Sequence, residues 1–231
     1  VLPLAIGRAT RLIEYMQEMA KAYTAEITIG YATDTEDRSG NVIERATHVE
    51  LERDKVESVL ASFVGTIEQV PPMFSAVRVE GKRLYELARK GLEVERQARK
   101  VTIHKLVLES FEPSGDYPKL VINVECSKGT YLRTLCKDIG KALGYPAVMS
   151  KLVRTMSCGL TLDQCLDLQT IADLCRSARI HEHIIAPGDA LPHFARLQLE
   201  EHKAEKLLQG QKVSIRNERT EVADRLEPAG E

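Results

Sequence analysis

The clearest pattern along the chain is a strand followed directly by a helix. Apolar residues alternate with other residues over 120–126, which predicts a mostly buried strand. Over 132–143 apolar residues recur every three or four positions, which predicts an amphipathic helix. Thr130 lies between them, and threonine is a common helix cap. We therefore expect a tight strand-to-helix turn, with Tyr131 and Arg133 just beyond it.

Alternation also predicts a strand at 23–32. Residues 101–109 are a further strand candidate, paired with 120–126 around the turn at 113–118. The turn-forming residues of 33–40 and a short strand at 42–44 would complete a hairpin with the first. An extended segment is expected at 149–156, a linker at 186–193 and a strand at Val213 and Ile215. Helices are expected at residues 8–18, 51–63, 82–90 and 168–178, with a short one inside 199–210.

The composition of the 231 residues indicates a globular protein, with 43% hydrophobic residues and a net charge of −2. No apolar run is long enough to cross a bilayer, and the first residues lack the features of a secretory signal, so a cytoplasmic protein without membrane association is expected. Val1 opens on a strand-like run without a cap, and native sequence is expected upstream of it.

Neither a metal site nor a cofactor site is expected. The five cysteines are odd in number and contain no CxxC pair, which disfavours a disulfide framework or a zinc site. His181 and His183 could be imagined as metal ligands, but a solvated patch is the preferred interpretation. The sequence has no Walker A loop and no GxGxxG motif, so no metal, nucleotide or redox cofactor is predicted.

Positive charge is concentrated in one segment of this mildly acidic chain. Residues 71–105 contain nine Lys or Arg residues against four Glu residues. Pro71 and Pro72 break regular structure here, and the connection between the flanking strands is long, which suggests a function. The alternative is an ordinary solvated helix face of mixed charge.

Arg133 is the residue most open to a chemical role. Arginine keeps its proton and offers a planar fork of donors, so a buried Arg133 could hold a catalytic carboxylate ionised. The alternatives are a surface arginine for Arg133 and a core tyrosine for Tyr131. Asp34 and Asp37 are interpreted as turn formers rather than as a catalytic carboxylate pair.

Together these motifs resemble the bacterial TruB-type tRNA pseudouridine synthases. The resemblance extends over nearly the whole chain and is most specific in GTIEQVPPMFSAV and CSKGTYLRT, with further matches in VLPLAIGRATRL, TDTEDRSG and KLVRTMSCG. It implies an α+β pseudouridine synthase fold, a mixed antiparallel sheet flanked by helices. Residues 1–192 would form the catalytic domain, with a thumb-like RNA-binding insertion at about 71–100. Residues 195–231 would begin a small β-rich, PUA-like RNA-binding domain.

The resemblance implies an isomerase that converts the T-loop uridine of tRNA to pseudouridine by base flipping, without a cofactor. The T-arm of tRNA would be the partner of a monomeric protein that needs no other protein. Arg133 and Tyr131 would be catalytic, Tyr23 would stack on the flipped uracil, and Leu152 would close the pocket. RNA phosphates would be bound by Lys82, Arg83, Arg89 and Lys90.

The family's nucleophilic aspartate lies in a GxLDPxATG motif directly before VLP. That position would fall upstream of Val1, so the 231 residues alone are expected to be inactive. Two other functions remain open at this point: a non-catalytic RNA-binding or RNA-folding protein on the same fold, and an enzyme acting on a different small substrate.

Overall fold

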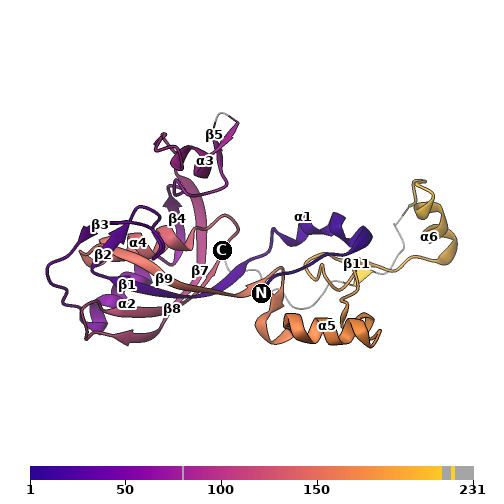
Figure 1. The fold of residues 1–231 in the computed structure, drawn as a ribbon. Helices are drawn as coiled ribbons and strands as arrows, with labels where there is room; N and C mark the ends of the chain where they lie inside the picture. Colours follow the sequence, from indigo (N-terminus) through magenta and orange to yellow (C-terminus); the bar gives the residue numbers. More distant parts are fainter. Residues whose placement is uncertain (80, 215–219, 222–231) are drawn as a thin grey trace. The chain divides into compact units, whose positions relative to one another are not determined.

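The chain forms two compact units in a computed structural model that describes residues 1–79, 81–214 and 220–221. The first unit comprises Val1–Leu4 and Gln17–Cys165, and the second comprises Ala5–Met16 and Leu166–Glu231. Figure 1 shows the elements of both, and each unit is described by itself.

A six-stranded antiparallel sheet forms the centre of the first unit (Figure 1). Its strand order is β10 (Leu160–Thr161), β9 (Ala147–Ser157), β1 (Lys21–Ile29), β8 (Lys119–Cys126), β7 (Arg99–Glu112) and β4 (Gly65–Gln69). The predicted pairing of the strands at 101–109 and 120–126 is confirmed as β7 against β8. Strands and helices mix as the α+β prediction requires, and that fold class is confirmed.

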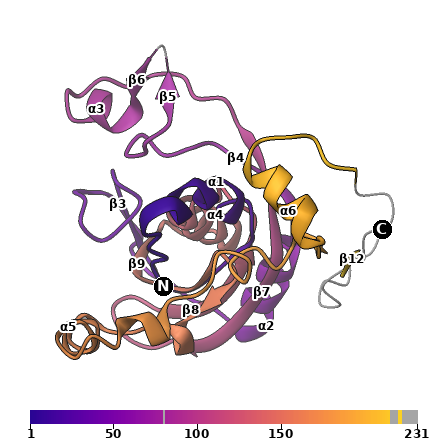
Figure 2. The same cartoon turned by 90° about the vertical axis from the view of Figure 1, so that its right-hand side faces the viewer.

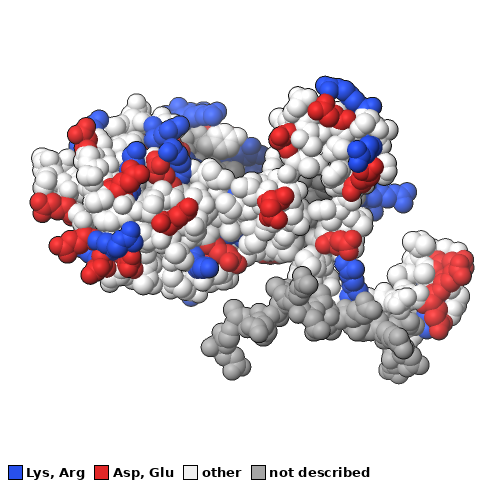
Figure 3. All heavy atoms as spheres, turned by 90° about the horizontal axis from the view of Figure 1, so that it is seen from below, with Lys and Arg blue, Asp and Glu red and all other residues white. Residues whose placement is uncertain are grey.

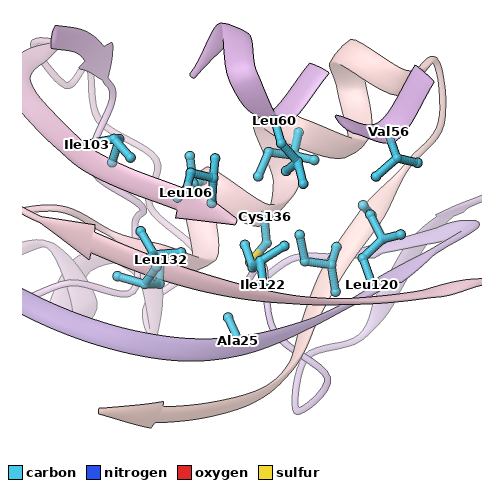
Figure 4. Close-up of a cluster of buried hydrophobic side chains, with 14 of the residues drawn as sticks. Ala25, Val56, Leu60, Ile103, Leu106, Leu120, Ile122, Leu132 and Cys136 are labelled. Atoms are coloured by element: carbon cyan, nitrogen blue, oxygen red, sulfur yellow. The ribbon is translucent and has the colours of Figure 1, made fainter. Parts of the chain in front are cut away.

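Helices α2 (Arg53–Ser62) and α4 (Leu132–Leu143) cover one face of this sheet. Apolar side chains of β1, β7 and β8 meet those of the two helices in Figure 4, and Figure 2 shows the sheet curving around α4. Ile122 on β8 and Leu135 on α4 are fully buried there. The alternation over 120–126 thus places Leu120, Ile122, Val124 and Cys126 in the core, as predicted.

The strand predicted at 23–32 is interrupted at Gly30. Strand β1 ends at Ile29, and the chain continues as β2 (Tyr31–Thr33), which pairs with β3 (Val42–Arg45) in the predicted hairpin. Gly30 has φ +120°, and a Cβ there would lie 2.6 Å from the ring of Tyr117. Glycine is therefore required by both the backbone and the close packing.

The start of α4 differs from prediction in its cap. Tyr131 is the N-cap, and no side-chain hydrogen bond caps the helix. The hydroxyl of Thr130 donates instead to the carbonyl of Ser127 at 2.9 Å, so the predicted capping role of Thr130 is wrong. The helix ends at Leu143, the last residue of the predicted helical spacing, and Gly144 after it adopts the left-handed conformation with φ +94°.

The thumb-like segment (71–100) connects β4 to β7 and is described except for residue 80. It contains a two-stranded hairpin of β5 (Arg78–Val79) and β6 (Lys82–Arg83), followed by the short helix α3 (Leu84–Ala88). In Figure 1 these elements project beyond the sheet at the ends of β4 and β7. Leu84 and Leu87 are buried, so the segment has a small apolar centre of its own.

The second unit is mainly helical in the part that the structure describes. Its elements are η1 (Gly7–Leu12), α1 (Ile13–Met16), α5 (Leu168–Arg176), η3 (Ile180–His183), β11 (Arg196–Leu197), α6 (Glu201–Leu208) and β12 (Thr220–Glu221). The predicted strand at Val213 is not formed, and Ile215 lies outside the described residues. Within the described ranges, no helix combines the length and apolar character that crossing a membrane requires.

Gly140 gives a direct test of how closely α4 packs on the sheet. A Cβ at this position would lie 2.2 Å from the Cβ of Ala147 and 3.0 Å from the carbonyl oxygen of Tyr145. Gly140→Ala should therefore lower the free energy of unfolding by about 1–3 kcal/mol, although alanine alone favours a helix by about 1 kcal/mol. Urea unfolding measures the change. The exposed control Lys141→Ala should stay within about 0.5 kcal/mol, and a stabilised Gly140→Ala protein would contradict this packing.

Candidate active site

The turn between β8 and α4 is fixed by a buried glutamine from β4. Gln69 is 2% exposed, and its side-chain amide bonds to both main-chain groups of Tyr131. The Oε1 atom accepts from the Tyr131 N–H at 3.0 Å, and the Nε2 atom donates to the Tyr131 carbonyl at 3.3 Å. Tyr131 therefore starts α4 from a position set by a residue 62 positions earlier in the chain.

Arg133, in the first turn of α4, is held by three acceptors from two distant segments. Its Nη1 donates to the carbonyl of Thr35 at 3.1 Å and to Oδ2 of Asp37 at 3.2 Å. Its Nη2 donates to the carbonyl of Phe74 at 2.7 Å. The side chains of Arg133 and Asp37 are each 23% exposed, so Arg133 lies partly buried against a carboxylate.

Asp37 therefore does more than form a turn, which is the only role that the sequence suggested for it. Its Oδ1 accepts hydrogen bonds from Thr35 and from the main chain and side chain of Ser39, while Oδ2 faces Arg133. Burial opposes ionisation, but the hydrogen bonds from Ser39 and Thr35 and the charge of Arg133 outweigh it. Together they hold the pKa of Asp37 below its ordinary value.

Tyr23 and Leu152 lie on neighbouring strands. Tyr23 on β1 pairs with Arg154 of β9, and Leu152 pairs with the buried Ala25 two positions further along β1. Burial raises the pKa of the Tyr23 phenol and the nearby Cys126 adds to this, whereas Arg154 acts in the opposite direction. Leu152 is 41% exposed, so an apolar surface remains available beside Tyr23.

The predicted site residues thus form two groups. Tyr131 and Arg133 start α4, while Tyr23 and Leu152 lie on β1 and β9. Lys21 of β1 pairs with Cys126, the last residue of β8. Tyr23 therefore lies near the end of β8 from which the chain continues to α4. Among the described residues, no hydrogen bond joins the two groups directly.

The four predicted RNA-binding cations all lie in the thumb-like segment and are exposed. Arg83 donates to the hydroxyl of Tyr85 at 2.9 Å, and the guanidinium groups of Arg83 and Arg89 lie 5.8 and 5.3 Å from the centre of the Tyr85 ring. Lys82, Arg89 and Lys90 form no ion pair with a described residue. These charges remain available to an anionic partner.

On the face drawn in Figure 3, Lys and Arg side chains are interspersed with Asp and Glu side chains.

A cavity of about 710 Å³ opens beside Arg38, Arg45 and Tyr117, but none of the predicted site residues lines it. Within the described residues, no group of three or more His, Cys, Asp or Glu side chains could hold a metal ion.

The fold is shared with chains of two solved complexes. A structure titled "Crystal Structure of a Cbf5-Nop10-Gar1 Complex" matches 91% of this chain and 54% of its own chain, with a TM-score of 0.68 at 23% identity. "Structure of H/ACA RNP bound to a substrate RNA containing 2'-deoxyuridine" matches 94% of this chain and 55% of its own chain, with a TM-score of 0.65 at 20% identity. This likeness defines the fold class.

Sequence comparison defines the family. Residues 1–132 match the family described as "TruB family pseudouridylate synthase (N terminal domain)", and residues 133–191 match "tRNA pseudouridylate synthase B C-terminal domain". The chain is 41% identical to tRNA pseudouridine synthase B of Bacillus pumilus over 97% of this chain and 73% of the relative. It is 46% identical to the enzyme of the same name from Bacillus licheniformis over 91% of this chain and 69% of the relative. The chain belongs to the TruB family of pseudouridylate synthases.

The charge of Asp37 should stabilise the fold in a pH-dependent way. A carboxyl group with a lowered pKa stabilises the folded state above its unfolded pKa of about 3.9, and this contribution is lost as the pH falls through the folded value. Asp37→Asn should cost on the order of 1–3 kcal/mol at pH 7 and progressively less below pH ~4. Urea unfolding at several pH values measures the difference from the unmodified protein.

Asp138 of α4 provides a control, because its pKa is shifted in the opposite direction from that of Asp37. Burial raises the pKa of this carboxyl, so ionisation of Asp138 opposes folding. The stability of Asp138→Asn relative to the unmodified protein should therefore increase as the pH rises above about 4. Equal pH trends for the two variants would contradict the electrostatic description of the site.

Proposed function

We propose that this protein forms pseudouridine at the T-loop uridine of tRNA. The observation that carries the proposal is the setting of Arg133, which lies in the CSKGTYLRT motif of a TruB family member. Its guanidinium group is partly buried and is fixed by the Asp37 carboxylate and by the carbonyls of Thr35 and Phe74. An arginine held in this way offers a fixed positive charge beside which a reacting carboxylate stays ionised. The names of the bacterial relatives support tRNA as the substrate.

The reaction is an isomerisation that consumes no other reactant. The N1–C1′ glycosidic bond of uridine breaks, the uracil turns within the site, and C5 bonds to C1′. The proton on C5 is lost and N1 becomes protonated, so the atoms balance. Such a reaction needs a carboxylate near the ribose and a pocket that retains the free uracil. It also needs the base out of its stack.

We infer that the reacting carboxylate is not Asp37. Both of its oxygens are engaged, Oδ1 by Thr35 and Ser39 and Oδ2 by Arg133, which makes this carboxylate a poor nucleophile. Asp37 instead orients Arg133. The nucleophilic aspartate would be carried by a segment that precedes Val1, as the resemblance implies.

The position of Val1 suits this assignment. The nitrogen of Val1 donates to the carbonyl of Arg154 at 2.6 Å, and Nε of Arg154 donates to the carbonyl of Val1 at 2.8 Å. Arg154 pairs with Tyr23 across β9 and β1. A segment that enters at Val1 would therefore bring its side chains close to Tyr23.

The remaining site residues would bind and close around the base. Tyr23 would stack on the flipped uracil, since an aromatic face is the common platform for a splayed RNA base. Leu152 would add apolar contact from the neighbouring strand. Tyr131, whose main chain is fixed by Gln69, would place its hydroxyl as a proton carrier. The thumb-like segment would bind the backbone of the T-arm.

Tritium release from T-arm RNA labelled at C5 of uridine tests the proposal. We expect release by a protein in which the 231 residues are preceded by a segment with the LDP motif, and none by the 231 residues alone. Turnover by the 231 residues alone would contradict an upstream nucleophile and favour Asp37. Tight RNA binding without turnover by either protein would instead favour a non-catalytic RNA-binding function.

The thumb-like segment generates a separate prediction about salt. Each phosphate that a cation neutralises contributes about 0.7 to 0.9 to the slope of log K against log salt. Replacing the four cations (Lys82, Arg83, Arg89, Lys90) by Gln should therefore flatten the slope for T-arm RNA by that amount for every phosphate that the variant no longer binds. Titrations at several salt concentrations measure it.

The control for this measurement replaces cations that already pair with carboxylates. Arg53 bonds to Glu57 at 2.9 Å, and Arg176 pairs with Asp173. Arg53→Gln with Arg176→Gln should leave the slope unchanged. An unchanged slope for the quadruple thumb variant would contradict its role in RNA binding.

A further inference from the structure

Glu36 is a buried carboxylate in a rare backbone conformation. It is 9% exposed and has φ +62°, the left-handed region that residues other than glycine seldom adopt. Its N–H donates to the carbonyl of Thr33 at 3.2 Å, and its carbonyl accepts from the N–H of Met149 on β9 at 3.2 Å. The main chain at Glu36 is therefore held on both sides.

The side chain of Glu36 is bonded to α4, the helix that carries Arg133. The Thr134 hydroxyl donates to Oε2 at 2.7 Å, and the Lys137 ammonium group pairs with Oε1. Thr134 is itself only 2% exposed. A buried carboxylate is stable only when it is paired and hydrogen-bonded in this way, so the interaction requires the loop and the helix to keep one relative position.

Three consecutive residues thereby bind the start of α4. The carbonyl of Thr35 accepts from Arg133, the side chain of Glu36 accepts from Thr134 and Lys137, and the carboxylate of Asp37 accepts from Arg133. Only the middle residue bonds to the helix beyond Arg133. Asp37 directly follows Glu36, so a shift of Glu36 would move the main chain of Asp37, which is also held by the Thr33 hydroxyl and by a bridge to Met149.

We propose that Glu36 is a positioning residue for the reaction, which holds the 35–37 loop on α4 so that Asp37 meets Arg133 in one geometry. This inference rests on the proposed function for its catalytic consequence, but the attachment of the loop to α4 is independent of it. Glu36 acts through Asp37 and Arg133 and does not touch the substrate. A charged group displaced by about 1 Å costs on the order of 100-fold in rate, which sets the upper range of the effect.

Glu26 provides a matched control elsewhere on the sheet. Its side chain is 13% exposed, against 11% for Glu36. It has the same kinds of partner, with the Ser150 hydroxyl and the Lys151 ammonium group each at 2.7 Å. Glu26 lies on β1 between the buried Ala25 and Ile27, so its side chain points to the opposite face from the core and α4. Removing Glu26 reproduces the loss of a half-buried ion pair without touching the candidate site.

The test compares Glu36→Ala and Glu26→Ala in the protein in which the 231 residues are preceded by the segment with the LDP motif. Glu36→Ala should slow single-turnover pseudouridine formation by roughly 10- to 100-fold and leave T-arm RNA affinity within about twofold. Glu26→Ala should lower stability while its rate stays within about twofold. Glu36→Gln, which keeps one acceptor for Thr134, should lose less rate than Glu36→Ala. Equal rates for Glu36→Ala and Glu26→Ala, both corrected for the folded fraction, would overturn the proposal.

Two further measurements test the positioning role. A double variant distinguishes it from a general loss of stability, and amide hydrogen exchange tests it independently of the proposed function. Glu36→Ala added to Asp37→Ala should slow the reaction no further than Asp37→Ala alone, because Glu36 acts through Asp37. Amide hydrogen exchange at 35–40 should increase in Glu36→Ala and not in Glu26→Ala. This exchange can be measured even in a protein that forms no pseudouridine. Unchanged exchange in Glu36→Ala would overturn the proposed attachment of the loop to α4 through Glu36.

Discussion

The attachment of Arg133 to two distant loops is the interaction on which the candidate site depends. One guanidinium group joins the first turn of α4 to the carbonyl of Phe74 in the thumb-like segment and to the 35–37 loop. Gln69 adds a second anchor at Tyr131. A planar fork of donors can satisfy acceptors from several directions at once, which a lysine cannot do in the same geometry. The start of α4, the loop and the base of the thumb-like segment are thereby fixed together.

This arrangement bonds the thumb-like segment directly to the candidate site. Phe74 lies near the start of that segment, and the Arg96 side chain near its end donates to the carbonyl of Pro71 at 3.2 Å. RNA phosphates bound by the exposed cations would therefore act on a segment that is bonded directly to Arg133. In the proposed function, binding of the T-arm would thus be coupled to the orientation of Arg133.

The sequence could predict most of the central strands and helices but not the side-chain bonds between them. The alternation over 120–126 and the helical spacing of 132–143 define β8 and α4 because both patterns are local. The resemblance in CSKGTYLRT directed attention to Arg133, and the roles of Tyr23, Leu152 and the thumb cations stay predictions. The pairing of Asp37 with Arg133 spans 96 positions, and that of Glu36 with Thr134 spans 98. Asp37 looked like a turn former because it is one, through Ser39, and nothing local shows its second partner.

The most direct test of the central role of Arg133 is a double-mutant cycle between Asp37 and Arg133 in the full-length protein. Asp37→Asn removes the charge of the acceptor, and Arg133→Lys keeps the positive charge but loses the planar fork. Single-turnover rates on T-arm RNA for the unmodified protein, both single variants and the double variant give the coupling. We expect the double variant to be slowed far less than the product of the two single effects, a coupling of at least about 1 kcal/mol. Rates that simply multiply, with affinity and folding unchanged, would contradict the partnership of Asp37 with Arg133.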